Sequence, residues 1–281
     1  MTGAVPRERR LLDGSTLPAI GFGTYPLKGE ECVTAVRSAI EAGYRLIDTA
    51  VNYGNEREVG EAIRRSGVPR EELVVTTKLP GRAHAYDDAV ASVRGSLEAL
   101  GLDRIDLHLI HWPNPRVGRY VEAYRALVDL RAEGLVGSVG VSNFTEEHLS
   151  RVVEATGVVP VVNQVELHPW FPQVELRAVH DRLGVVTEAW SPLGKRRAPF
   201  GEAPVVAAAE RHGVTPGQVV LRWQLQLGNV PIPKSATPER QRQNLDVFGF
   251  ELSEEEVAAI TGLSRPDGRL FDGDPETHEE M

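Results

Sequence analysis

Four polar side chains of different chemistry stand at the ends of apolar, strand-like runs, or just beyond them. They are Asp48, Tyr53, Lys78 and His111. A phenol has a reference pKa of about 10 and is a weak acid at neutral pH unless a nearby cation stabilises its anion. Lys78 could be that cation for Tyr53, Asp48 could hold the lysine, and His111 could hydrogen-bond a substrate oxygen. Such a set protonates an oxygen that gains negative charge, as carbonyl reduction by hydride requires.

Each of these residues has a plainer alternative. Asp48 could cap a helix, Tyr53 could be a packed loop aromatic, and His111 could be a satisfied histidine at a rim. Lys78 is harder to dismiss, because only four of the 31 basic residues are lysines. It follows Val74–Thr77, and a buried ammonium needs a carboxylate partner. A Schiff-base aldolase with Lys78 as nucleophile is a rival, but it requires a lowered lysine pKa, which a neighbouring Asp48 would oppose.

Short apolar runs alternate with helical patterns along the chain. The runs are Ala19–Phe22, Arg45–Ile47, Val74–Thr77, Ile105–Ile110, Val136–Val141, Val161–Glu166, Val185–Ala189 and Val230–Ile232. The helical patterns are Glu31–Glu41, Asp88–Leu100, Gly118–Glu133, Thr145–Glu154, Val174–Leu183, Val205–Leu227 (split near Gly213 and Pro216), Pro238–Asn244 and a last helix that a capping box at Ser253 and Glu256 opens. This alternation predicts parallel strands in a closed (β/α)8 barrel, with an open doubly wound sheet as the alternative. In such a barrel the chemistry lies at the carboxyl ends of the strands, where the polar residues fall.

The length of 281 residues suits one domain. Division by about 150 residues per domain suggests roughly two domains, but one barrel takes about 250 residues, and we find neither a linker nor a composition shift. We therefore expect a single TIM-barrel domain over residues 1–281. Asp13-Gly14 predicts an N-terminal β-hairpin. An extra C-terminal helix and a tail from Arg265 to Met281 should follow, with the tail on the surface at one end of the barrel.

Composition excludes several classes of protein. Hydrophobic residues make up 41% and the net charge is −9, so we expect an ordered globular protein that does not bind nucleic acid. No run approaches the ~18 apolar residues of a membrane span. Cys32 is the single cysteine, so no internal disulfide can form, which suits a reducing cytoplasm. We expect a cytoplasmic monomer that binds a small molecule, with no metal site.

A second polar group follows the last strand-like run. It consists of Lys234, Ser235, Thr237 and Arg240. Two cations and two hydroxyls at the start of a short helix predict an anion site, although a solvated loop before a capped helix would look the same. Trp190 could stack on a nicotinamide ring or pack in the core. The glycine fingerprint of Rossmann folds is absent, because Gly21–Pro26 has proline where the third glycine should stand.

These motifs resemble those of the aldo-keto reductase superfamily over about residues 9–265. The resemblance lies in Gly43–Glu56, in Gly101–Pro113, and in Ile232–Ser235 with Arg240 and Asn244. Gly140–Phe144 and Asn163–Glu166 are further landmarks. Short loops after His111 and Gly194 are similar to those of compact prokaryotic members such as the 2,5-diketo-D-gluconate reductases.

The resemblance implies NADPH-dependent reduction of aldehydes or ketones, with activated dicarbonyls, diketo sugars or aryl aldehydes as substrates. It implies that Tyr53 is the general acid, that Lys78 and Asp48 tune it, and that His111 orients the carbonyl. The implied cofactor residues are Gly23, Thr24, Tyr25, Ser142, Asn143, Gln164, Trp190, Ser191, Leu193, Gly194, Lys234, Ser235, Thr237, Arg240 and Asn244. The implied substrate pocket contains Tyr25, Tyr53, His111 and Trp112, with Trp170 as a further wall.

Two departures from the family pattern affect cofactor binding. Trp190 stands where many members have tyrosine, and Gln243 where many have glutamate. The alternative hypothesis is a regulatory, non-enzymatic barrel subunit that binds NADPH. The complete set of four polar residues argues against it.

Overall fold

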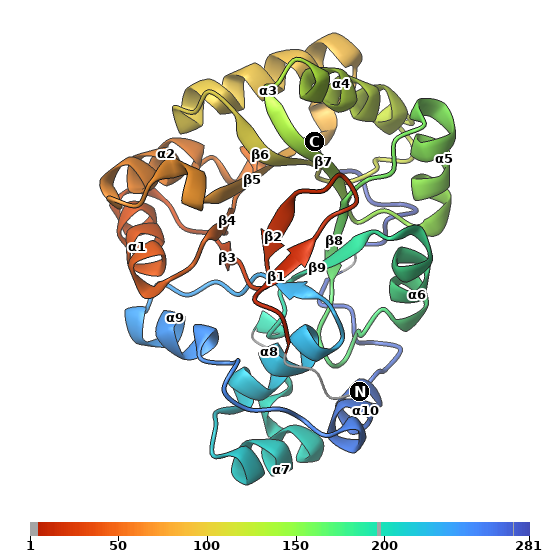
Figure 1. The fold of residues 1–281 in the computed structure, drawn as a ribbon. Helices are drawn as coiled ribbons and strands as arrows, with labels where there is room; N and C mark the ends of the chain where they lie inside the picture. Colours follow the sequence, from red (N-terminus) through yellow and green to blue (C-terminus); the bar gives the residue numbers. More distant parts are fainter. Residues whose placement is uncertain (1–4, 196–197, 272) are drawn as a thin grey trace.

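Eight parallel strands form the centre of the molecule (Figure 1). The computed structural model describes residues 5–195, 198–271 and 273–281. The strands are β3 (Phe22–Gly23), β4 (Leu46–Asp48), β5 (Val74–Leu79), β6 (Ile105–Ile110), β7 (Val136–Ser142), β8 (Val162–Glu166), β9 (Val186–Trp190) and β10 (Val230–Pro231). Each pairs in parallel with the next strand in the chain. Each of the eight strand-like runs overlaps one of these strands. The first run shares only Phe22 with its strand, and the bounds of the others agree to within two residues.

The sheet closes between its first and last strands. Gly21 N donates to Pro231 O at 3.0 Å, and Gly23 N donates to Pro233 O at 3.2 Å. A Cβ on Gly23 would lie 3.2 Å from the carbonyl oxygen of Ile232, so glycine suits this close approach of the two edges. The fold is a (β/α)8 barrel, and the alternative of an open sheet is wrong.

Helices surround the barrel (Figure 1). They are α1 (Gly29–Ala42), α2 (Glu56–Arg65), α3 (Tyr86–Leu100), α4 (Tyr120–Ala132), α5 (Glu146–Thr156), α6 (Val174–Leu183), α7 (Ala203–His212), α8 (Pro216–Gln226), α9 (Pro238–Leu245) and α10 (Glu254–Thr261). All the predicted helices are present, including the break between α7 and α8. The predicted capping box opens α10, where Ser253 Oγ accepts a hydrogen bond from Glu256 N at 3.2 Å. Helix α2 was not predicted.

The amino end of the barrel is covered by the predicted hairpin of β1 (Glu8–Arg10) and β2 (Thr16–Pro18). Leu11 and Leu17 of this hairpin belong to the same buried cluster as Leu46, Leu107 and Leu109 of the barrel strands. Burying these side chains removes apolar surface from water and excludes solvent from this end of the barrel. Access to the interior is therefore left to the opposite, carboxyl end.

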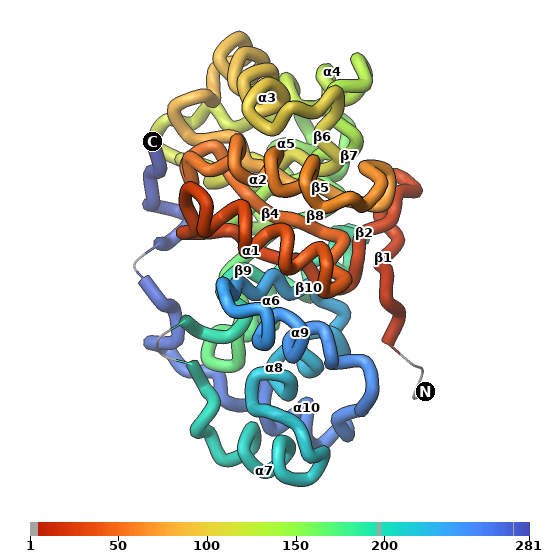
Figure 2. The backbone as a smooth tube through the Cα atoms, turned by 90° about the vertical axis from the view of Figure 1, so that its left-hand side faces the viewer, coloured from red at the N-terminus to blue at the C-terminus, as the bar shows by residue number. Residues whose placement is uncertain are grey.

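The C-terminal tail lies across the carboxyl end of the barrel, on the side away from the hairpin (Figure 2). The Phe271 ring stacks on that of Trp190, with centroids 5.3 Å apart, and the carboxylate of Glu280 reaches His111. The predicted position of the tail is thus correct, but its contacts with these residues were not expected. No helix among the described residues is long and apolar enough to cross a membrane.

Candidate active site

Asp48 and Lys78 form an ion pair at the carboxyl ends of β4 and β5. Lys78 Nζ lies 2.6 and 2.7 Å from the two Asp48 carboxylate oxygens and donates to Thr49 O at 2.8 Å. The lysine is 0% exposed. Burial alone would lower the pKa of Lys78, but the Asp48 charge and hydrogen bond, together with the nearby Tyr53 and Glu188, outweigh burial and raise the pKa. A permanently charged lysine suits an electrostatic role and argues against the aldolase nucleophile.

Tyr53 lies above this ion pair. It ends the 3-10 turn Val51–Tyr53, which follows β4, and its ring centroid lies 5.0 Å from Lys78 Nζ. Burial raises the pKa of Tyr53 to about 12, although the Lys78 charge opposes the shift. The expectation that Lys78 favours the Tyr53 anion agrees with this, since the lysine lowers the pKa of the phenol, but desolvation of the phenolate exceeds the attraction of the cation. Lys78 limits the rise rather than reversing it.

His111 completes the group of four. It follows β6, and its ring centroid lies 5.7 Å from that of Tyr53 in an edge-on arrangement. Phenol and imidazole thus face one region at the carboxyl end of the barrel, with the ion pair beneath the phenol. The structure brings together all four residues that the sequence singled out, and the set can donate hydrogen bonds and a proton to one oxygen atom.

A buried acid beside this group was missed. Gln164 Nε2 donates to Asp48 Oδ2 and to Glu188 Oε2, both at 2.8 Å. Glu188 lies inside the barrel on β9 and is 0% exposed. Burial and the Asp48 charge raise the pKa of Glu188 to about 8. The only sequence signal was a charged residue within the run Val185–Ala189.

The residues implied to bind a nicotinamide carboxamide lie together at the ends of β7 and β8. Ser142 Oγ donates to Gln164 O at 2.7 Å, and Asn143 Nδ2 donates to His111 O at 3.0 Å. Trp190 Nε1 donates to Asn143 Oδ1 at 2.8 Å. Because Asp48 and Glu188 take both protons of the Gln164 amide, its Oε1 stays available to accept a hydrogen bond from a carboxamide NH2. The side chains therefore fit that group.

Trp190 is covered by two residues that the sequence analysis did not select. Phe271 stacks on it with an interplanar angle of 19°. Lys195 Nζ lies 5.1 Å from the Phe271 ring and 5.8 Å from the Tyr25 ring. Phe271 is a lone aromatic residue in a tail of charged and small residues, and that isolation was the available signal.

The predicted anion site begins directly after β10. Lys234 and Arg240 are exposed, and neither pairs with a carboxylate of the described residues. Thr237 N donates to Ser235 Oγ at 3.1 Å, which shapes the loop before α9. Unpaired cations beside a helix N-terminus suit a phosphate group.

The remaining predicted cofactor residues lie on loops around the carboxyl end. Ser191, Leu193 and Gly194 belong to a tight turn after β9, where Gly194 N donates to Ser191 O at 2.9 Å. Gly23 ends β3, and Thr24 follows it with a buried Oγ1 that has no hydrogen-bond partner among the described residues. Asn244 lies half-buried near the end of α9.

The walls predicted for the substrate pocket differ in their surroundings. Tyr25 is 55% exposed, and its ring centroid lies 5.1 Å from that of Tyr53. Trp112 is buried, and its ring centroid lies 4.3 Å from that of His278 in the tail. Trp170 instead donates from Nε1 to Glu202 at 3.0 Å and lies under the guanidinium of Arg265, 3.8 Å from it.

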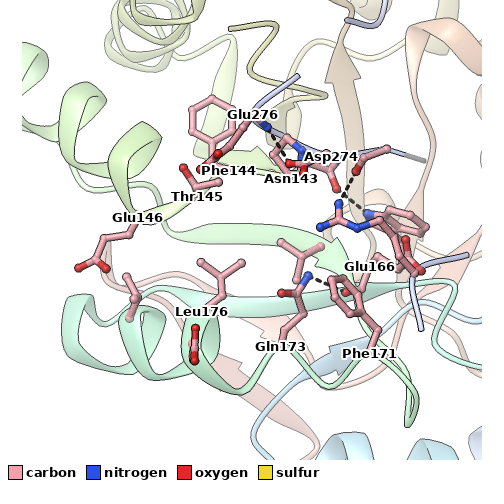
Figure 3. A pocket seen from close by; sticks show the side chains of 17 residues that line it. Asn143, Phe144, Thr145, Glu146, Glu166, Phe171, Gln173, Leu176, Asp274 and Glu276 are labelled. Atoms are coloured by element: carbon pink, nitrogen blue, oxygen red, sulfur yellow. Dashed lines mark hydrogen bonds between the residues drawn. The ribbon is translucent and has the colours of Figure 1, made fainter. Parts of the chain in front are cut away.

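A cavity of about 380 Å³ opens beside Asn143 and Trp190 (Figure 3). Tail residues Asp274 and Glu276 line it together with Gln173 before α6. It adjoins the side chains implied to bind the carboxamide, and the tail forms one of its walls.

Comparisons with known proteins agree with this geometry. The sequence model of the "Aldo/keto reductase family" matches residues 19–198 and 202–265. The chain is 59% identical over 271 residues to 2,5-diketo-D-gluconic acid reductase B of Corynebacterium sp. (strain SHS752001), covering 96% of this chain and 97% of the relative.

Two solved structures show the same fold. A mutant of Gox0644, solved in complex with NADPH, has a TM-score of 0.92 and 44% identity over 97% of this chain and 98% of that chain. An aldo/keto reductase from Brucella melitensis has a TM-score of 0.89 and 44% identity over 92% of this chain and 100% of that chain.

Proposed function

The chain belongs to the aldo/keto reductase family, and on that premise we propose that Asp48, Tyr53, Lys78 and His111 perform its reaction. The protein is an NADPH-dependent oxidoreductase that reduces aldehydes or ketones to alcohols. It is therefore an enzyme, and the alternative hypothesis of a regulatory NADPH-binding subunit is wrong. The observation that carries the assignment of roles is the buried Lys78–Asp48 pair beneath Tyr53.

The chain's own residues supply the proton and the orientation. NADPH, when bound, provides the hydride. The Tyr53 hydroxyl protonates the carbonyl oxygen as negative charge develops there, and the adjacent ammonium of Lys78 stabilises the phenolate that remains. Asp48 keeps that ammonium charged and in place. His111 hydrogen-bonds the same oxygen and sets its direction.

Separate sets of side chains would hold the nicotinamide, the pyrophosphate, the 2′-phosphate and the adenine of the cofactor. Ser142, Asn143 and Gln164 would bind the carboxamide, and Trp190 would stack on the ring. The turn with Ser191, Leu193 and Gly194 would line the pyrophosphate, with Gly23, Thr24 and Tyr25 on the facing loop. Lys234, Ser235, Thr237 and Arg240 would bind the 2′-phosphate, and Asn244 the adenine. The cations before and within α9 pair with no carboxylate of residues 5–195, 198–271 or 273–281, which supports the phosphate assignment.

For the substrate we propose activated dicarbonyls, diketo sugars or aryl aldehydes. The relative named 2,5-diketo-D-gluconic acid reductase B is 59% identical to this chain, which supports a diketo acid. The aromatic rings of Tyr25 and Trp112 beside the polar group suit an apolar substituent on the carbonyl. Methylglyoxal, phenylglyoxal, 2,5-diketogluconate and a nitrobenzaldehyde form a panel that separates these classes.

Loss of the Tyr53 hydroxyl tests the proposed roles. We expect Tyr53→Phe to lower kcat by about 100-fold or more, because a general acid contributes about 10²- to 10⁴-fold. NADPH oxidation at 340 nm with the carbonyl panel measures it. Tyr86→Phe is the matched control, since the Tyr86 hydroxyl contacts Asp129 on the outer helices. Equal activity of Tyr53→Phe and the native enzyme would mean that another group is the acid.

We also propose that the enzyme works as a monomer in the cytoplasm. Cys32, the single cysteine of the chain, is a buried free thiol, which suits a reducing compartment. Among the large exposed apolar side chains of the described residues, Leu12, Val174 and Phe200 lie on separate segments, whereas Tyr25 and Phe271 both lie near Lys195 at the carboxyl end.

A further inference from the structure

We propose that Glu280 is a positioning residue that holds the ring of His111 from the C-terminal tail. Its carboxylate Oε1 lies 2.8 Å from His111 Nδ1. The inference rests on the proposed role of His111 and adds a residue that neither the motifs nor the strand ends indicated. It concerns how the ring is held, and Glu280 need not touch the substrate.

The loops after β5 and β6 bind the backbone of Glu280. The Asn114 side chain accepts a hydrogen bond from Glu280 N at 3.3 Å and donates one to Glu280 O. Asn114 is fully buried and adopts a φ of 47°, a conformation that asparagine tolerates better than most residues. At Gly81 a Cβ would lie 1.9 Å from the backbone carbonyl oxygen of Glu280, so the tail packs directly against the main chain of this glycine. These contacts fix the main chain at a defined place.

The carboxylate itself is aimed by a second set of contacts. Asn52 Nδ2 donates to Glu280 Oε1 at 2.7 Å, and Arg82 donates to the Asn52 side-chain oxygen, which sets the direction of that amide. Burial would raise the pKa of Glu280, but the contacts with His111 and Asn52 lower it below its usual value. Glu280 is therefore a carboxylate at neutral pH and can only accept hydrogen bonds.

A carboxylate at this place constrains how the imidazole ring of His111 can turn. Glu280 Oε1 lies 2.8 Å from Nδ1 without the angle of a hydrogen bond. The contact is therefore a close approach of a carboxylate to the Nδ1 side of the ring, and Nε2 is the nitrogen on the side away from Glu280. Nε2 is then the nitrogen left to contact a substrate oxygen. Glu280 places its negative charge beside the ring and limits rotation of the ring.

The neighbouring acid provides a matched control. Glu279 Oε1 accepts from the backbone N of Arg116 at 2.6 Å. It is also half-buried and lies in the same tail, but its carboxylate binds a backbone amide on the loop after β6. Substituting either glutamate with glutamine changes the charge equally, so a difference between the two variants reports the contact with His111.

The experiment compares Glu280→Gln and Glu279→Gln by ¹⁵N NMR of the histidine side chains, with His111→Asn to assign the signals. We expect Glu280→Gln to shift the His111 ring nitrogen signals and to lower kcat roughly tenfold, as for loss of a charged hydrogen bond. The KM for NADPH should stay within about twofold, and Glu279→Gln should match the native enzyme. The NMR spectra are recorded without cofactor, so this readout is independent of turnover.

Several results would overturn the inference. Unchanged His111 signals in Glu280→Gln, whether or not kcat falls, would show that the carboxylate does not act through the ring. Equal shifts in Glu279→Gln would indicate a general effect of tail charge. The Tyr53→Phe test separates the proposed function from the role of Glu280. If Tyr53→Phe is inactive while Glu280→Gln changes neither the His111 signals nor kcat, only the role of Glu280 is wrong.

Discussion

Glu188 keeps a proton inside the barrel at neutral pH. Its pKa is raised to about 8, while an unfolded glutamate titrates near 4.5. Since the folded-state pKa is the higher one, the stability contributed by the protonated carboxyl is fully present below the unfolded pKa. It is lost as the pH rises through the folded pKa.

Glu188→Gln should remove this pH dependence, because glutamine keeps the Gln164 contact without a proton to lose. The free energy of unfolding of the native chain should fall relative to that of the variant as the pH rises from 5 to 8. The fall should be a few kcal/mol, since one pKa unit corresponds to about 1.4 kcal/mol. Urea unfolding of both proteins at the two pH values measures it. If the free energies of unfolding of the variant and the native chain differ by the same amount at pH 5 and at pH 8, Glu188 does not hold the proton.

Arg240 should discriminate between the two nicotinamide cofactors. We expect Arg240→Ala to raise the KM for NADPH roughly tenfold, the effect of one charged hydrogen bond, and to leave the KM for NADH nearly unchanged. Arg242→Ala, on the same exposed helix α9, is the control. Equal effects of Arg240→Ala on both cofactors would remove the 2′-phosphate assignment.

The residues that sequence reasoning found share one signal, which is a polar side chain at or just beyond the end of an apolar run. Asp48 and Lys78 have it, and the structure pairs them. Glu188 lies within its strand and points into the barrel, so the same signal could not reveal it. The influence of Lys78 on the pKa of Tyr53 could be predicted, but the opposing effect of burial could not, because the depth of burial depends on packing by distant segments.

Helix α2 shows how packing selects a residue that propensity disfavours. Gly60 lies inside this helix, where a Cβ would approach Leu100 O to 2.0 Å. Gly95, inside α3, has no atom within 4 Å of the same position. Glycine weakens helices, which is one reason why α2 went unnoticed, but here it permits close contact with the end of α3.

We expect opposite effects from one substitution at these two sites. Gly95→Ala should raise the free energy of unfolding by up to about 1 kcal/mol through helix propensity. Gly60→Ala should lower it by about 1–3 kcal/mol through overpacking. Urea titrations of the two variants provide the comparison, and similar changes in both would mean that α2 can shift away from Leu100.

The tail presents Phe271 to the face of Trp190. If a nicotinamide ring uses this face, Phe271 must leave it, and the lost stacking weakens cofactor binding. We expect Phe271→Ala to tighten NADPH binding by about two- to tenfold, in line with the energy of one aromatic pair. Titration calorimetry measures the Kd, with Phe200→Ala as an exposed aromatic control. Weaker binding by Phe271→Ala would instead make Phe271 a part of the cofactor site.

At the scale of the whole molecule, the alternation of strands and helices was enough to predict the barrel. Right-handed, parallel connections leave few ways to arrange eight such units. The hydrogen bonds from Gly21 to Pro231 and from Gly23 to Pro233 close the barrel, and like the contacts of the tail they join parts of the chain far apart in sequence. Local patterns do not report such contacts.

The distribution of apolar surface leads to a prediction for the assembly state. Because exposed apolar side chains such as Leu12, Val174 and Phe200 lie on separate segments and the net charge is −9, copies of the chain should repel rather than associate. Light scattering after size exclusion should give a mass of 30.8 kDa at micromolar concentration. A mass twice as large would show an interface that these side chains do not reveal.

The positions of the lysines bear on how this enzyme can be attached to a support. Lys78 is sealed inside the barrel, so only three lysines can react with an amine-selective reagent. Lys28 donates to Tyr53 O, Lys195 lies over Tyr25, and Lys234 follows β10. All three surround the carboxyl end. Coupling through lysine would therefore turn the active end toward the surface of the support, whereas coupling through acidic residues of the outer helices would leave it open.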